Sequence, residues 1–325
     1  MSSFLSSLIW NPIVAKELRS RMRGWHAAAM LTAYLSVIGG IGYLVYASDV
    51  GNTSTVLQSA AVGSGVFAAL AGSVIGTVVL VVPGLVGPAI SGERERQTLD
   101  LLLVTPLRPG RIVVGKLLAA LVFVAFLVVA CLPLFSVSFL LGGVALASVL
   151  EAVAFTLVVA LSLGSVSILA SAVLRRPTTS SVVSYLLMLA LVAGPLVSGY
   201  IWDRVQQSAN PGAGIAPVTT TLLLPAGANA VGTFSTSPAV VESISPAMGA
   251  VSLLASNACG TYSAYAPLTG TFFPVGSCSN SGQYLAVLGP LGTWPIWEAT
   301  MLFDGIVALG ALGASVLVMR RREGS

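Results

Sequence analysis

Apolar stretches long enough to cross a lipid bilayer recur six times along this 325-residue chain. Crossing about 30 Å of hydrocarbon takes about 20 residues of α-helix. The chain also has 56% hydrophobic and only 8% charged residues, more apolar surface than a soluble core can enclose. The pattern therefore predicts an all-α integral membrane protein with six transmembrane helices. The predicted spans cover residues 27–46, 66–86, 112–135, 150–174, 181–201 and 296–319.

The basic residues are distributed unevenly over the segments between these spans. Fourteen of the 15 Lys and Arg residues lie in the two termini and in the loops after the second and fourth spans, and only Arg204 lies elsewhere. Cytoplasmic segments of membrane proteins are enriched in Lys and Arg. We therefore expect both termini in the cytoplasm. We also expect a multi-pass protein of the plasma membrane, of prokaryotic origin. No basic patch interleaved with aromatic residues indicates a nucleic-acid partner.

The spans and loops divide the chain into four parts. Residues 1–26 are expected to be a cytoplasmic interfacial helix, 27–201 hold five spans with a cytoplasmic loop at 88–111, 202–295 form an extracytoplasmic domain, and 296–325 hold the sixth span and a basic tail. The exterior segment is rich in Gly, Pro, Ser and Thr yet contains apolar stretches, which favours a folded piece over a linker. The apolar run "SFLLGGVALASV" before the fourth span leaves two alternatives open, a hairpin of longer helices or a re-entrant helix.

The three cysteines fall into two compartments under this topology. Cys259 and Cys278 lie in the exterior segment, whereas Cys131 lies within the third span. An oxidising exterior favours a disulfide between Cys259 and Cys278, which would stabilise the segment by about 3 kcal/mol. Three cysteines and one histidine give no metal-binding cluster, so no metal site is expected.

The N-terminal stretch "NPIVAKELRSRMRGW" has the pattern of an amphipathic helix. Asn11 can cap the helix, Pro12 suits its first position, and apolar residues recur on one face opposite the basic ones. Such a helix lies flat on the lipid bilayer. It could anchor the first span or take part in a mechanism, and the sequence leaves both readings open. The residues of interest in it are Lys16, Glu17, Arg19 and Arg23.

The cytoplasmic loop "GPAISGERERQTLDLLLVTPLRPGRIVVGKLLA" predicts a short helix with charges of both signs. Glu93 and Glu95 stand at its start, where the helix dipole favours acids, and Arg96 and Asp100 are spaced for an i,i+4 ion pair. Three leucines share one face before Thr-Pro ends the pattern. Because so short a helix is unstable alone, we expect it to dock into a groove on a soluble partner.

Within this loop, "GRIVVGKL" matches the spacing of a phosphate-binding loop but not its context. Such a loop follows a buried strand and ends in Ser or Thr, whose hydroxyl holds Mg²⁺. Here Leu117 takes that place, and a membrane span follows. We therefore expect no nucleotide site in this chain, and we interpret Lys116 as an anchor that extends toward the lipid headgroups.

Two stretches of the chain resemble a known family. "SGERERQTLDLLLVTPLRPGRIVVGKLLA" resembles the E-R-E-x-G-T-L-E-x-L-L-x-T-P … G-K segment of ABC-2 type transporter permeases, and "NPIVAKELRSRMRG" is similar to their N-terminal helix. Gln97 stands where that pattern often has glycine. The resemblance implies a second permease copy, identical or not, and two cytoplasmic ATPase subunits that carry ATP and Mg. It also implies a coupling helix seated on the ATPase, formed by Glu93, Arg94, Glu95, Arg96, Gln97, Thr98, Leu99 and Asp100.

One acidic residue lies inside a predicted span. Asp304 is seven residues below Trp297, hence about 10 Å below the outer interface. A buried intramembrane acid is a candidate for a translocation path or a subunit interface. The alternative is a local pair with a hydroxyl or a backbone group.

Two other classes of function compete with an ATP-driven exporter. A secondary transporter would show inverted repeats with broken helices, and no convincing repeat is found. A membrane-embedded enzyme would need a nucleophile, a metal motif or paired acids, and His26 is the only histidine. The sequence thus favours the transport subunit, which is not an enzyme by itself, and leaves the transported substrate open.

Overall fold

The computed structural model describes residues 25–50, 56–95, 109–142, 144–209, 218–221, 231–234, 245–247, 250, 253–254 and 296–323. Within these ranges, six helices are long and apolar enough to cross a membrane, which confirms the expected number of spans. A short helix and a two-stranded sheet are also present. The elements are α3 (Trp25–Val50), α4 (Val56–Val86), α5 (Ser91–Glu95), α7 (Pro109–Leu141), α8 (Leu146–Val173), α9 (Pro177–Ala209), β1 (Val218–Thr221), β2 (Val231–Phe234) and α12 (Ile296–Glu323).

The connection between α7 and α8 decides between the two alternatives left open by the sequence. Helix α7 continues to Leu141 and α8 begins at Leu146, so the run forms a hairpin of longer helices. Gly142 follows α7 with a φ of +85°. That left-handed conformation is strained for residues with a Cβ, and glycine allows the chain to reverse there.

The connection between α8 and α9 follows from a proline. Pro177 is the first residue of α9, a position where its missing N–H costs nothing. The residue before a proline disfavours the α conformation, and α8 has already ended, with Leu174 in an extended conformation. The two helices therefore reverse direction over three residues.

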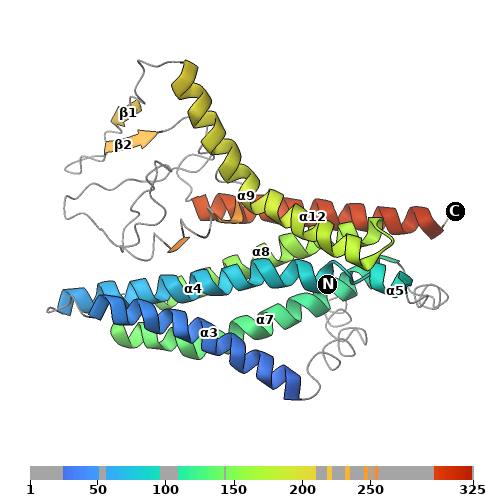
Figure 1. Ribbon diagram of the computed structural model, residues 1–325. Coiled ribbons are helices and arrows are strands. Elements are labelled where there is room, and N and C mark those ends of the chain that lie inside the picture. The colour runs from blue at the N-terminus through green and yellow to red at the C-terminus, as the bar shows by residue number, and fades with distance from the viewer. Residues whose placement is uncertain are drawn as a thin grey trace, which may run out of the picture.

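Helix α8 lies at the centre of the bundle. It packs against α4, α7, α9 and α12, and its closest partner is α12. Helix α3 lies at the periphery against α4 and α7, with large apolar side chains exposed. Figure 1 shows α5 and the C-terminal end of α12 at one end of the bundle and the β1–β2 pair at the opposite end. We call the first of these the α5 end.

Part of the segment 202–295 packs into the bundle. Leu253 is fully buried in the main hydrophobic core, and the Ser245 hydroxyl donates to the Val192 carbonyl of α9 at 2.7 Å. Strands β1 and β2 pair antiparallel, with Val218 opposite Phe234. The expectation of an all-α protein holds for the spans but missed this hairpin, because strand pairing between short polar segments has no strong local pattern.

Several sequence predictions concern residues outside the described ranges. They are the amphipathic helix with Lys16, Glu17, Arg19 and Arg23, the part of the coupling helix from Arg96 to Asp100, and the disulfide between Cys259 and Cys278. These stay predictions. Cys131 lies in α7, where it is buried and free, as expected, and its thiol donates to the Tyr34 hydroxyl of α3 at 3.2 Å.

Candidate functional site

The turn between α4 and α5, residues 87–90, lies at the α5 end and is held by several hydrogen bonds. Gly87 precedes Pro88, and this pair ends α4 because the residue before a proline disfavours the helical conformation. The Gly87 N–H still bonds to the Pro83 carbonyl at 2.8 Å, and the Arg94 N–H bonds to the Ile90 carbonyl at 3.1 Å. The chain therefore leaves one helix and starts the next within four residues.

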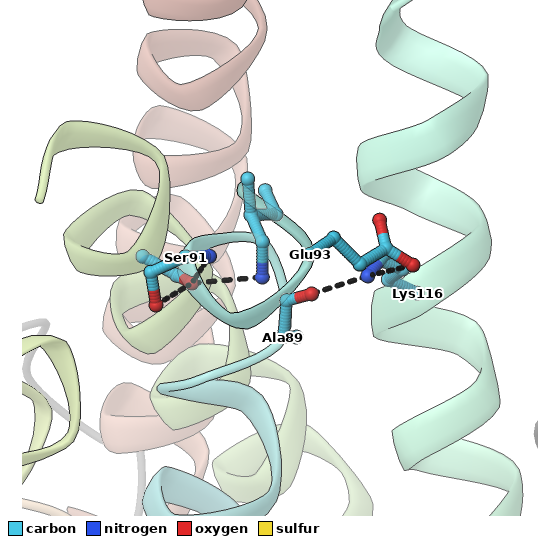
Figure 2. Close-up of polar contacts among 6 residues, drawn as sticks. Ala89, Ser91, Glu93 and Lys116 are labelled. Carbon is cyan, nitrogen blue, oxygen red and sulfur yellow. Dashed lines mark hydrogen bonds and ion pairs between the residues drawn. The ribbon is translucent and has the colours of Figure 1, made fainter. Parts of the chain in front are cut away.

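An ion pair from α7 holds one side of this turn. The Lys116 ammonium lies 2.8 Å from a Glu93 carboxylate oxygen, with 5% and 26% of the two side chains exposed. The same ammonium donates to the Ala89 carbonyl. Figure 2 shows Lys116 reaching from α7 toward both groups. The ion pair and the added hydrogen bond hold α5 against α7, because separating two charges that are largely shielded from water is costly.

A hydroxyl from α8 holds the other side. Ser171 is fully buried, and its oxygen accepts the backbone N–H groups of Ile90 at 2.9 Å and Ser91 at 3.1 Å. The hydroxyls of Ser91 and Ser171 lie 3.4 Å apart. In Figure 2, Ser91 lies on the side of the turn opposite Glu93. The first N–H groups of a helix have no partner within it, and here a side chain of another helix supplies one.

Helix α9 and the end of α8 complete the enclosure. The Ser180 hydroxyl of α9 donates to the Gly87 carbonyl at 2.6 Å, and the Arg94 guanidinium donates to the Leu174 carbonyl at 3.3 Å. A Cβ on Gly87 would lie 3.1 Å from the Ser181 Cα, so glycine allows α9 to approach this closely. We call the turn 87–90 with α5, Lys116, Ser171 and Ser180 the α5 anchor.

The α5 anchor is suited to mechanical transmission. Side chains of α7, α8 and α9 make five contacts to one short segment, residues 87–93. Four of these contacts are to its backbone and one is to the Glu93 carboxylate. In the residues that the structure describes, no group of three or more His, Cys, Asp and Glu side chains could hold a metal ion. The stretch from Gly110 to Lys116 forms the first turns of α7, a helix and not a phosphate-binding loop. A push on α5 would therefore move the ends of α7, α8 and α9 with it.

The family comparison agrees with this architecture. A sequence model described as "ABC-2 family transporter protein" matches residues 11–273, well over half of the chain. No curated protein matches the chain at a significant level. The chain belongs to the ABC-2 family of transporter proteins. It is a membrane subunit of an ABC transporter, as the sequence resemblance implied.

The structure places only the first part of this permease's expected coupling helix. Glu93, Arg94 and Glu95 lie in α5, and the Glu95 side chain is exposed. Glu93 instead faces Lys116 within the same chain. The interpretation of Lys116 as an anchor toward the lipid headgroups is wrong, because its side chain is buried and its ammonium contacts the Glu93 carboxylate and the Ala89 carbonyl. Sequence spacing alone could not show that α7 returns beside α5.

Asp304 of α12 lies where this helix contacts α8. It is fully buried in α12 and accepts a hydrogen bond from the Ser162 hydroxyl of α8 at 3.1 Å. The sequence offered a local hydroxyl pair as one alternative, and the structure contains that pair. A hydroxyl donor offsets part of the cost of an acid in this apolar surrounding. The role of Asp304 in a translocation path stays a prediction.

The sequence analysis did not identify the residues of α8 and α9 that bond to the α4–α5 turn and the start of α5. Ser171 and Ser180 bracket the reversal "SAVLRRPTTS" and are fully buried. Hydroxyl side chains in apolar helices often bond across helix contacts, and this could have raised Ser171 as a candidate. Its partners, however, lie 80 and 81 residues earlier in the chain.

Proposed function

We propose that this permease couples ATP hydrolysis by a separate cytoplasmic ATPase to the export of a substrate. It works with a second permease copy, identical or not, and ATP and Mg²⁺ bind to the ATPase subunits. The chain itself carries no nucleotide site and is not an enzyme alone. The observation that carries the proposal is the α5 anchor, which connects an exposed helix end to three membrane helices.

The mechanism follows from the chemistry of α5. Glu95 is exposed at the end of α5 and offers a negative charge to a basic socket on the ATPase. When ATP draws two ATPase subunits together, rigid-body movement of the socket displaces α5. The ends of α7, α8 and α9 follow the movement of α5, because an ion pair or hydrogen bonds join each of them to the anchor. Substrate passage then alternates between two arrangements of the spans.

Charge reversal at Glu95 tests the ATPase partnership. We expect Glu95→Lys to reduce co-purification of the ATPase with the tagged permease by about tenfold, because it places a cation against a basic socket. The control is Glu151→Lys, which changes an acid in the second turn of α8, at the end of the bundle away from α5. Fluorescent ATP binding to the purified permease alone is measured in parallel. Saturable binding there, or an undiminished complex with Glu95→Lys, would contradict the proposal.

Labelling in intact cells tests the orientation of the spans. We expect Arg176→Cys and Ser325→Cys to be shielded from an impermeant thiol reagent, and Gly214→Cys to react, because basic segments stay in the cytoplasm. The unmodified chain is the control, since its exterior cysteines are expected to be paired and Cys131 is buried. Reaction of Arg176→Cys from outside would overturn the topology.

A further inference from the structure

We propose that Ser171 is the positioning residue through which movement of α5 enters the membrane bundle, with α8 as the receiving helix. The inference rests on the proposed function and adds a defined point of entry to it. Its basis is the pair of hydrogen bonds from the backbone of Ile90 and Ser91 to the buried Ser171 oxygen.

The other connections of α5 to the membrane helices transmit its movement less directly. Toward α4, the turn at Gly87 and Pro88 interrupts the helix, so α5 does not extend α4 as one rigid rod. Toward α7, the connection runs through Lys116, whose four-carbon stem can change rotamer while the ammonium keeps its partners. Toward α9, Ser180 bonds to the Gly87 carbonyl, which precedes the break at Pro88 and is not part of α5. These helices therefore follow a movement of α5 less directly than α8 does.

The Ser171 connection is short and stiff. The serine oxygen is separated from the α8 backbone by one carbon and one rotatable bond, and it bonds directly to two consecutive backbone N–H groups. Leaving this position would leave two buried donors without an acceptor. Ser171 therefore ties the backbone of α5 to the backbone of α8.

Helix α8 can carry the movement to the rest of the bundle. It packs against α4, α7, α9 and α12. Ser162 lies nine residues before Ser171, about 14 Å along the helix, and its hydroxyl bonds to the buried Asp304 of α12. A displacement of α8 that begins at Ser171 would reach α12 through this hydrogen bond and through the packing of α8 against α12.

The same helix supplies a matched control. Ser167 lies one turn before Ser171 and is 1% exposed, but its hydroxyl bonds to the Leu163 carbonyl of its own helix at 2.7 Å. Ser167→Ala and Ser171→Ala thus remove the same group at the same burial. Only Ser171→Ala removes bonds between α5 and α8.

Hydrogen exchange of the purified complex with its ATPase tests the proposal. Without nucleotide, we expect amides in residues 87–95 to exchange about tenfold faster in Ser171→Ala than in wild type or Ser167→Ala, because two N–H groups lose their acceptor. With ATP and vanadate, wild type and Ser167→Ala should change exchange both at 87–95 and at 146–156, the far end of α8. Ser171→Ala should change only at 87–95.

The outcomes separate the inference from the proposed function. No nucleotide-driven change at 87–95 in wild type would overturn both. A normal response at 146–156 in Ser171→Ala would overturn the inference alone, and so would loss of that response in both serine variants. If Ser171→Ala does not assemble, Ser171→Cys replaces it, because sulfur has nearly the same size and accepts weakly. A full wild-type response from Ser171→Cys then overturns the inference.

Discussion

Lys116→Ala is expected to destabilise the permease by about 3 kcal/mol and to abolish most ATPase co-purification. The change removes the ion pair between Lys116 and the Glu93 carboxylate, whose side chain is 26% exposed, and the Ala89 carbonyl loses its charged donor. Removing one partner of a buried ion pair costs about 3–5 kcal/mol, and partial exposure of Glu93 places the effect at the lower limit. Thermal unfolding of the purified permease and the yield of the complex are the measurements.

Two further variants separate the charge from the packing. Lys116→Met keeps an apolar stem of similar length and should lose nearly as much stability, since Glu93 still loses its ion pair with Lys116. The double variant Lys116→Met with Glu93→Gln removes both charges and should recover part of the loss. Arg176→Ala, an exposed cation at the same end, is the control for net charge. Wild-type stability of Lys116→Ala would show that the ion pair does not hold α5.

Gly63→Ala is expected to have a comparable or larger effect on folding, at the opposite end of the bundle. A Cβ on Gly63 would lie 2.0 Å from the Gly142 carbonyl oxygen and 3.2 Å from the Leu141 Cβ. The closest atom belongs to the backbone of the turn between α7 and α8, so no rotamer change relieves the collision. Shifting that turn should cost about 3 kcal/mol or more. Size-exclusion profiles and thermal unfolding of the detergent-solubilised protein measure the loss.

A glycine of the same helix gives the control for this prediction. A Cβ on Gly76 of α4 would have no atom within 4 Å. Gly76→Ala should therefore be neutral or stabilising by up to about 1 kcal/mol, because alanine favours the helix more than glycine does. A folded yield for Gly63→Ala equal to that of Gly76→Ala would contradict the close approach of α4 to the turn.

The spans were predictable because their signal is local. Each apolar run carries its own evidence for a helix, and lipid requires every backbone group in it to be bonded within the helix. The prolines at 109 and 177 likewise mark the first residues of α7 and α9 from local geometry alone. The family was recognisable from contiguous motifs, one of which includes Glu93 and Lys116.

The roles of individual residues in the α5 anchor depended on contacts between distant parts of the chain. The position of Lys116 at the start of a predicted span favours an anchor that extends toward the lipid headgroups, yet Glu93 and Ala89 lie beside it. Ser171 carried no signal for a partner 80 residues away. The membrane-spanning segments follow from the order of residues along the chain. The meeting of polar groups from different helices depends on how those helices pack, because packing and not sequence spacing brings them within hydrogen-bond distance.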